Sequence, residues 1–226
     1  MKNICVFDVN ETLLDLQPIH AELERVSGNP NTGKLWFGQL IQSALVSTIT
    51  GEYKDFGTIG GSALDMVAEQ QGLDLSDDDK RSVLGKMREL PPHPEVPESL
   101  DRLKKAGFTL VTLTNSTDAV VRAQLKNSGL ETYFDDVFSA DEVKRLKPAA
   151  EPYAMVADHL GVAVTDLCLV AAHAWDIAGA AHAGYRTAFI ARPGKVADPL
   201  AKHPDIVGSD LASVVDQLLA QEGGQA

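Results

Sequence analysis

The sequence has few cysteines, few positive charges and no long apolar run. Its two cysteines, Cys5 and Cys168, each lie in a short apolar run, which predicts buried thiols rather than a disulfide or a metal site. Lysine and arginine total 20 against 32 acidic residues, and the net charge is -12. This balance argues against nucleic acid and anionic membranes as partners, because both require a basic face.

Segments that would direct the chain to a membrane are also missing from the sequence. No apolar run reaches the roughly 20 residues that span a bilayer. The first apolar run, Ile4–Phe7, is too short for a secretion signal and leads directly into acidic residues. We therefore expect a cytoplasmic protein.

Short apolar runs alternate with helical patterns over most of the chain. The runs predict strands at Ile4–Phe7, Thr109–Leu113, Val137–Phe138, Leu167–Val170 and Thr187–Ile190. The helical patterns lie at Val96–Ala106, Asp118–Asn127, Tyr153–Leu160, Ala174–Ala183 and Leu211–Leu219. This alternation predicts an α/β fold in which a Rossmann-like parallel sheet is covered by helices on both faces.

Residues 16–90 interrupt this alternation. They carry helical patterns and a helix start rich in acids, but no convincing strand pattern. The stretch Pro91–Pro94 marks the return to alternating strands and helices. We therefore expect a core formed by residues 1–15 and 91–226, with residues 16–90 inserted after the first strand as a helical cap.

Polar residues follow the predicted strands at their carboxyl ends, where open α/β sheets bind ligands. The first strand is followed by residues 8–12, the second by residues 114–116 and the fourth by residues 171–176. A lysine, Lys147, lies in the loop before the helix that leads to the fourth strand. We expect these four segments to meet at one rim of the sheet.

Four motifs in these segments together resemble the haloacid dehalogenase superfamily. They are Phe7–Leu13 (FDVNETL), Leu113–Ser116 (LTNS), Lys147-Pro148 followed by Tyr153, and Ala172–Ala180 (AHAWDIAGA). The fourth motif, together with Leu35-Trp36 and residues 94–100, is most similar to the L-2-haloacid dehalogenases (type II). The resemblance covers essentially the whole chain and implies a family cap after the first strand, no cofactor, and a possible homodimer.

The resemblance implies a hydrolase in which the carboxylate of Asp8 is the nucleophile. Lys147 would pair with Asp8 and keep it ionised. Asp176 would help to activate the water that hydrolyses the resulting ester. The structural alternatives are a helix or turn cap for either acid and a solvated turn for the lysine.

Further residues of the motifs are expected to support the nucleophile or bind the substrate. Thr12, Thr114 and Asn115 would position Asp8 and bind a substrate carboxylate through hydroxyl, amide and backbone donors. Tyr153 matches a family tyrosine near the lysine, although packing is an equal alternative. Ser116 is a candidate N-cap for the next helix.

Asn10 separates two classes of reaction. Phosphatases of the superfamily carry a second aspartate here as general acid, and an amide has no such proton to give. Dehalogenases need no acid because halide leaves unprotonated, but they usually carry tyrosine here, so Asn10 departs from both patterns. Ala172 replaces an acid of the phosphatase metal site, which leaves at most weak Mg²⁺ binding at Asp8, Asn10 and Asp176.

Two positions depart from the dehalogenase pattern. Phe37 stands where the family carries an arginine that binds substrate and halide, so we expect it to line the substrate pocket with Trp175. Arg25 and Lys34 are candidates for the missing charge. His173 replaces the family's asparagine and is expected to act as a general base or an anion-binding cation, or else to be structural.

Three functions remain open. We rank hydrolytic dehalogenation of a small, anionic 2-haloacid through an ester on Asp8 first, because Asn10 and the fourth motif favour it. A phosphatase or phosphonate hydrolase is second, and a non-catalytic binding protein on the same scaffold is third. The substrate, its stereochemistry and the halide are not determined by the sequence.

Overall fold

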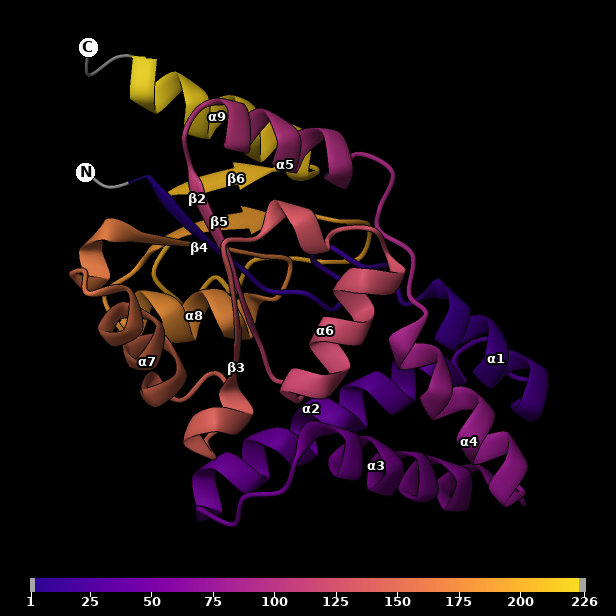
Figure 1. The fold of residues 1–226 in the computed structure, drawn as a ribbon. Coiled ribbons are helices and arrows are strands. Elements are labelled where there is room, and N and C mark those ends of the chain that lie inside the picture. The colour runs from indigo at the N-terminus through magenta and orange to yellow at the C-terminus, as the bar shows by residue number, and fades with distance from the viewer. Residues whose placement is uncertain (1–2, 224–226) are drawn as a thin grey trace.

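The computed structural model describes residues 3–223, in which six parallel strands form one sheet with the order β3-β2-β1-β4-β5-β6 (Figure 1). The strands are β1 (Ile4–Phe7), β2 (Thr109–Thr114), β3 (Asp136–Ser139), β4 (Leu167–Ala171), β5 (Arg186–Ile190) and β6 (Ile206–Gly208). The α/β class and the five predicted strands are confirmed. The sequence does not predict β6, because three residues at the edge of a sheet form no recognisable apolar run.

Side chains of β1 alternate between two apolar layers, as expected for a strand buried on both faces. Cys5 and Phe7 pack in one cluster and Ile4 and Val6 in the other. The first cluster contains residues of α5 (Val96–Lys105), α6 (Asp118–Asn127) and α9 (Leu211–Gly223), and the second those of α7 (Ala150–Leu160) and α8 (Ala174–His182). Helices therefore cover both faces, as predicted.

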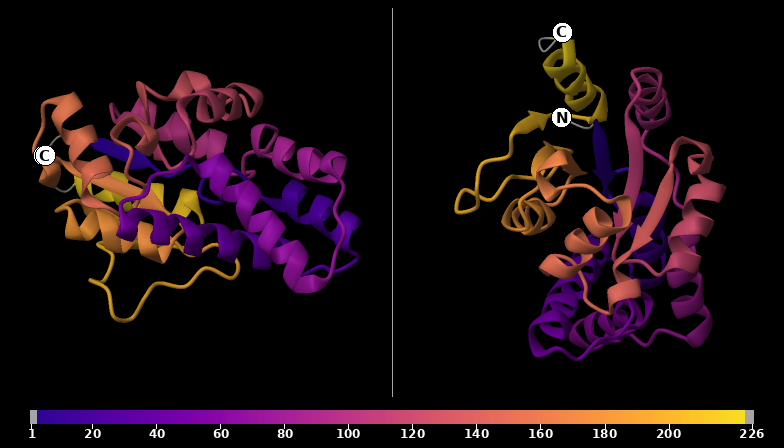
Figure 2. Two further views of the ribbon diagram at one scale, coloured as in Figure 1. Left: turned by 90° about the horizontal axis from the view of Figure 1, so that it is seen from below. Right: turned by 60° about the vertical axis from the view of Figure 1, so that its left-hand side comes forward.

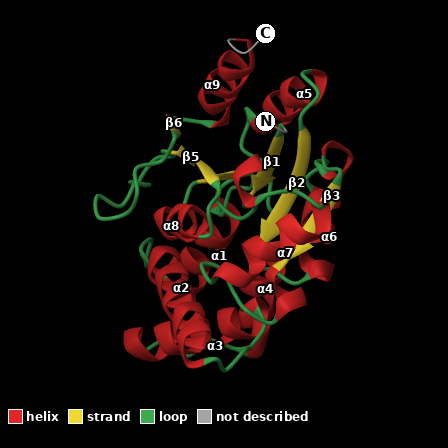
Figure 3. Ribbon diagram, turned by 90° about the vertical axis from the view of Figure 1, so that its left-hand side faces the viewer, coloured by secondary structure: helices red, strands yellow, loops and turns green. Residues whose placement is uncertain are grey.

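Residues 16–90, all of which the structure describes, form four α-helices and one short 3-10 helix and contain no strand. The helices are α1 (Gln17–Ser27), α2 (Thr32–Thr50), α3 (Phe56–Gln71) and α4 (Asp77–Gly85), followed by η1 (Lys86–Arg88). Ser76 and Asp79 form the predicted helix start as a reciprocal capping box. Figure 3 shows these helices beyond the arrowheads of the strands, so they face the carboxyl ends of the sheet.

The two ends of this helical segment leave the sheet side by side. The amide of Asp15 donates to the carbonyl of Pro91 at 2.8 Å, and the amide of His93 donates to the carbonyl of Leu13 at 3.0 Å. These bonds close the segment at its base and hold the chain after β1 against the chain before α5.

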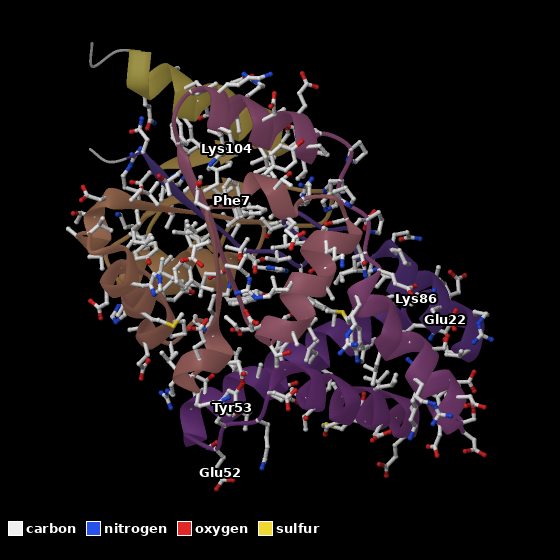
Figure 4. The ribbon with its side chains drawn as sticks, viewed as in Figure 1. Phe7, Glu22, Glu52, Tyr53, Lys86 and Lys104 are labelled. Carbon is white, nitrogen blue, oxygen red and sulfur yellow. The ribbon has the colours of Figure 1, made fainter. Side chains whose placement is uncertain are left out.

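Contacts also join the helical segment to the sheet region at its far end. The Tyr53 hydroxyl donates to the carboxylate of Asp141 in η3 (Ala140–Val143), and the ammonium of Lys144 lies 5.1 Å from the centroid of the Tyr53 ring. Figure 4 labels Tyr53 where the chain after α2 meets η3. Buried Trp36 and Leu40 share the apolar cluster of β1, so the segment packs closely over the strand ends.

The long loop between β5 and β6 stands out from the body of the molecule (Figure 2). It begins at the carboxyl end of β5, so its first residues lie at the same rim as the ends of β1 and β4. Among residues 3–223, no helix is both long and apolar enough to cross a membrane. Cys5 and Cys168 are buried thiols on neighbouring strands.

Candidate active site

Asp8 ends β1 and is held by three side chains from distant parts of the sequence. Its Oδ1 accepts a hydrogen bond from the Lys147 ammonium at 2.9 Å, and its Oδ2 accepts one from the Thr12 hydroxyl at 2.7 Å. The Nδ1 atom of His173 lies 3.1 Å from the same Oδ2. Burial alone would raise the pKa of Asp8, but Lys147, His173 and Thr12 outweigh it and hold that pKa well below its ordinary value.

Lys147 links the two acids of the site. Its ammonium donates to Asp176 Oδ2 at 2.5 Å and to the Leu113 carbonyl at 2.8 Å, in addition to Asp8. Burial opposes its charge, but the two carboxylates keep the pKa of Lys147 above its ordinary value. Tyr153 donates its hydroxyl to Asp176 Oδ1 at 2.6 Å, and all four side chains are nearly or fully buried. Burial is also the main reason why the pKa of Asp176 is raised.

Several residues expected to bind substrate are engaged with the protein. The Asn115 amide holds the Lys147 backbone, accepting from its N–H at 2.7 Å and donating to its carbonyl at 3.3 Å. The Thr114 hydroxyl accepts from the Ser116 amide at 3.2 Å. Thr114 and Asn115 therefore shape the rim, and Asn115 orients the lysine with one of its two amide N–H groups.

Asn10 is likewise occupied. Its amide nitrogen donates to the Ser116 hydroxyl at 3.2 Å, and its carbonyl oxygen accepts from Gln124 of α6 at 2.9 Å. Ser116 is not the N-cap of α6, because that position is Thr117, whose side chain makes no capping hydrogen bond. The Ser116 hydroxyl instead accepts the hydrogen bond from Asn10. Through Gln124, Asn10 also connects the loop after β1 to α6.

Three aromatic rings form a stack beside Asp8. The His173 ring lies between Phe37, with centroids 5.6 Å apart, and Trp175, with centroids 5.2 Å apart, and both pairs are inclined by 23°. The Lys147 ammonium lies 5.8 Å from the Trp175 ring centroid. Phe37 and Trp175 therefore stand at the site, as walls for the imidazole ring.

Three further charged residues, which the motifs do not predict, lie at the site: Glu11, Lys195 and Arg192. Glu11 Oε2 lies 2.8 Å from His173 Nε2 and accepts from the Lys195 ammonium at 2.5 Å. Arg192 donates to the Thr12 carbonyl at 2.6 Å and pairs with Glu95 at 2.9 Å. Ligands bind at the carboxyl ends of strands in open α/β sheets. The strand that ends at Ile190 is followed by Arg192 and Lys195, so the same argument points to these two cations.

Arg25 and Lys34 are the two candidates to supply the positive charge that Phe37 lacks, and they lie in different places. Arg25 is wrong for this role, because its exposed guanidinium pairs with Glu22 and Asp79 on the outside of the helical segment. Lys34 lines a cavity of about 620 Å³ together with Glu11, Phe37, Arg192 and Lys195. We call this space the side cavity; its lining carries these three cations together with the acids Glu11 and Asp15.

A second cavity, of about 510 Å³, is lined by the buried ring of Trp36. Its lining is mainly apolar and includes Trp36, Leu40, Phe56 and Val120, with Ser116 at its edge. Glu11 and Phe37, which contact His173, line the side cavity and not this one.

The oxygen donors at the site do not fit a Mg²⁺ ion in this arrangement. Both oxygens of Asp176 receive hydrogen bonds, from Lys147 and Tyr153, and the Asn10 carbonyl oxygen receives Gln124. Among the described residues, no group of three or more histidine, cysteine or acidic side chains is arranged to hold a metal. No chemical step is therefore assigned to a metal here.

Comparison with known proteins identifies the family of the chain. The family model of haloacid dehalogenase-like hydrolases matches residues 2–184. The (S)-2-haloacid dehalogenase 1 of Pseudomonas sp. (strain CBS-3) is 33% identical over 193 residues, which cover 84% of this chain and 85% of the relative. The (S)-2-haloacid dehalogenase 4A of Burkholderia cepacia is 31% identical over 192 residues, covering 84% and 83%.

A solved structure shares the fold over nearly the whole chain. The L-2-haloacid dehalogenase from Xanthobacter autotrophicus, with chloropropionic acid covalently bound, superposes with a TM-score of 0.90 at 23% identity and covers 97% of this chain and 99% of its own. With the family model matching residues 2–184, the chain belongs to the family of haloacid dehalogenase-like hydrolases.

Proposed function

We propose that the protein hydrolyses the carbon–halogen bond of a small 2-haloacid through an ester on Asp8. The observation that carries this proposal is the state of Asp8, a buried carboxylate kept ionised by Lys147 and Thr12 at the end of β1. The names of the two relatives, both (S)-2-haloacid dehalogenases, support this reaction and the (S) configuration of the substrate.

In the first step, a carboxylate oxygen of Asp8 attacks C2 of the substrate. The new C–O bond forms as the carbon–halogen bond breaks, and the halide leaves with the bonding electron pair and with inversion at C2. No proton is required for this step. The Asn10 amide, bonded to Ser116 and Gln124, suits such a reaction because it offers no acid to the leaving group.

In the second step, water attacks the Cγ carbon of the Asp8 ester. Asp176 accepts the proton from this water, and its raised pKa makes it a stronger base than an ordinary aspartate. The ester bond breaks, and the 2-hydroxyacid leaves with the proton returned from Asp176. The second proton of the water is released to solvent, which restores the Asp8 carboxylate. Lys147 and Tyr153 hold Asp176 in place through both of its oxygens.

The helical segment 16–90 has the position of a cap in this proposal. It packs over the strand ends and contributes Phe37 and Trp36 near the site. Burial of Asp8 beneath this segment keeps bulk water away from the ester and so strengthens the electrostatic interactions around it. The homodimer and the cytoplasmic location remain predictions.

The proposal is tested by measuring halide release from (S)-2-chloropropionate and chloroacetate by ion chromatography. We expect turnover by the natural protein and none above background for Asp8→Asn, which keeps the shape of the side chain but removes the nucleophile. Absence of halide release from both haloacids would contradict the proposal. Asp8-dependent release of phosphate from a generic ester in the presence of Mg²⁺ would support the phosphatase instead.

A further inference from the structure

The His173 ring has a carboxylate at each of its nitrogens. Nδ1 lies 3.1 Å from Asp8 Oδ2, and Nε2 lies 2.8 Å from Glu11 Oε2. Both acids act as acceptors. Asp8 also accepts hydrogen bonds from Lys147 and Thr12, and Glu11 also accepts one from Lys195. A neutral imidazole has one N–H group, whereas an imidazolium has two. Only the imidazolium donates both hydrogen bonds, which makes His173 a cation and leaves it no lone pair to serve as general base.

Electrostatics agrees with this geometry. Burial by itself would lower the pKa of His173, but the hydrogen bonds and charges of Asp8 and Glu11 reverse this and raise it. Burial would raise the pKa of Glu11, but His173 and Lys195 hold it below its ordinary value. Phe37 and Trp175 cover the two faces of the ring, where aromatic π-systems attract a cation.

Glu11 occupies a backbone conformation that is unfavourable for a residue with a side chain. Its φ angle is 58°, in the left-handed region that favours glycine. Its side chain is nevertheless only 14% exposed and points its oxygen at His173 and Lys195. A strained residue with such contacts indicates a function for its carboxylate.

The two oxygens of Asp8 are not equivalent. Oδ2 faces two donors, the Thr12 hydroxyl and His173 Nδ1, whereas Oδ1 faces only the Lys147 ammonium. The Thr12 hydroxyl accepts the Ala172 amide at 3.0 Å, so its own hydrogen is directed to Asp8. Oδ1 therefore has more freedom to attack, and Oδ2 remains the carbonyl oxygen of the ester.

We propose that Thr12 and the His173 imidazolium form an oxyanion hole for the hydrolysis of the Asp8 ester, and that Glu11 is the positioning residue that holds His173 in its charged form. This inference rests on the ester mechanism proposed above. When water adds to Cγ, the electron pair of the C=O bond moves to Oδ2, and the two donors stabilise the negative charge that develops there. Re-formation of the C=O bond then breaks the bond between Cγ and Oδ1.

The charges that face this oxyanion come from several elements. Before the ester forms, the carboxylates of Asp8, Glu11 and Asp176 are paired with Lys147, Lys195 and the His173 imidazolium. Lys34 and His20 of the helical segment and Arg192 of the loop after β5 line the side cavity nearby. When the oxyanion forms on Oδ2 of the neutral ester, the His173 imidazolium is the cation whose N–H faces the new negative charge.

The test separates the two chemical steps by single-turnover kinetics with excess enzyme. Halide release reports formation of the ester, and mass spectrometry of the peptide that contains Asp8 reports its hydrolysis. We expect His173→Ala to slow ester hydrolysis by roughly 100-fold and Glu11→Gln by roughly 10-fold, while halide release changes much less. In both variants the ester on Asp8 accumulates.

Two further variants distinguish positioning from folding. Glu11→Gly suits the backbone at φ 58°, so it should preserve thermal stability and still accumulate the ester. Glu95→Gln is the matched control, since Glu95 pairs with Arg192 of the same loop as Lys195, and it should leave both steps unchanged.

Equal slowing of both steps in Glu11→Gln, or hydrolysis at the natural rate in His173→Ala, would overturn the inference while leaving the dehalogenase proposal intact. No halide release from the natural protein would overturn both.

Discussion

The two sides of Asp8 differ in how they are built. On one side, Lys147 bridges Asp8 and Asp176 in a fully buried set that the sequence motifs predict. On the other side, His173 bridges Asp8 and Glu11 between two aromatic rings, with Lys195 at the edge of a cavity. The residues on the lysine side match the motifs of the dehalogenase family, whereas His173 and Phe37 on the other side differ from them. The comparison shows that the same carboxylate can be stabilised both by a permanent ion pair with lysine and by a histidine whose charge depends on pH.

The largest expected effect is the loss of the bridge on the lysine side. Lys147→Met leaves Asp8 and Asp176 buried without their shared cation, and we expect a loss of about 3–5 kcal/mol in the free energy of unfolding together with loss of halide release. Urea denaturation and ion chromatography measure the two effects. The exposed pair Lys104–Asp135 offers a control, because Lys104→Met should change stability by less than about 1 kcal/mol. Unchanged activity in Lys147→Met would remove the lysine from the mechanism.

The contributions of Asp8 and His173 to stability should also respond to pH in opposite directions. The pKa of Asp8 is lowered in the folded protein, so its stabilising contribution is present above its unfolded pKa and is lost as pH falls. The pKa of His173 is raised, so the contribution of its imidazolium is present below its unfolded pKa and is lost as pH rises through the folded value. We expect the rate of ester hydrolysis to fall at high pH, and this fall to begin at lower pH in Glu11→Gln. Identical alkaline limbs in the two proteins would show that Glu11 does not control His173.

A smaller effect is expected at Tyr153. Tyr153→Phe removes the hydroxyl that donates to Asp176 at 2.6 Å but keeps the ring in its apolar layer. Because a hydrogen bond to a charged group is worth about 1.5–3 kcal/mol, we expect ester hydrolysis to slow by roughly 10-fold, with little change in halide release. A rate equal to that of the natural protein would assign Tyr153 to packing alone.

The smallest effect is expected at the outer end of the histidine side. Lys195 touches Glu11 rather than His173, so Lys195→Met should slow ester hydrolysis only a few-fold. Lys34→Met, in the same side cavity, tests whether any cation there has this effect. A larger loss in Lys195→Met than in Glu11→Gln would mean that Lys195 acts on the substrate directly.

The sequence predicted the lysine side because its residues follow strand ends in recognisable motifs. Asp8, Lys147, Tyr153 and Asp176 lie within one connected set of hydrogen bonds, as expected from the order of the strands. The same rule located His173 but did not identify its partners. Glu11 belongs to the first motif, yet its contact depends on a left-handed turn that no pattern in the sequence specifies.

Other errors have a similar physical origin. Arg25 lies on a helix whose rotation turns it outward, and helix periodicity alone does not relate that face to the sheet. The contacts of Asn10 with Ser116 and with Gln124 of α6, and of Asn115 with the Lys147 backbone, were likewise not predicted. Strand β6 is too short to produce a pattern. In each case the outcome depends on how loops and helices meet in space.

The role of Asp8 is tested most directly by a single turnover in water enriched in oxygen-18. The ester mechanism predicts that water adds to the Asp8 carbon, so the heavy oxygen enters the Asp8 carboxylate and the 2-hydroxyacid receives an ordinary oxygen from Asp8. Mass spectrometry of the peptide and of the product measures both. Heavy oxygen in the product and none in Asp8 would contradict the account, because water would then have displaced the halide without the aspartate.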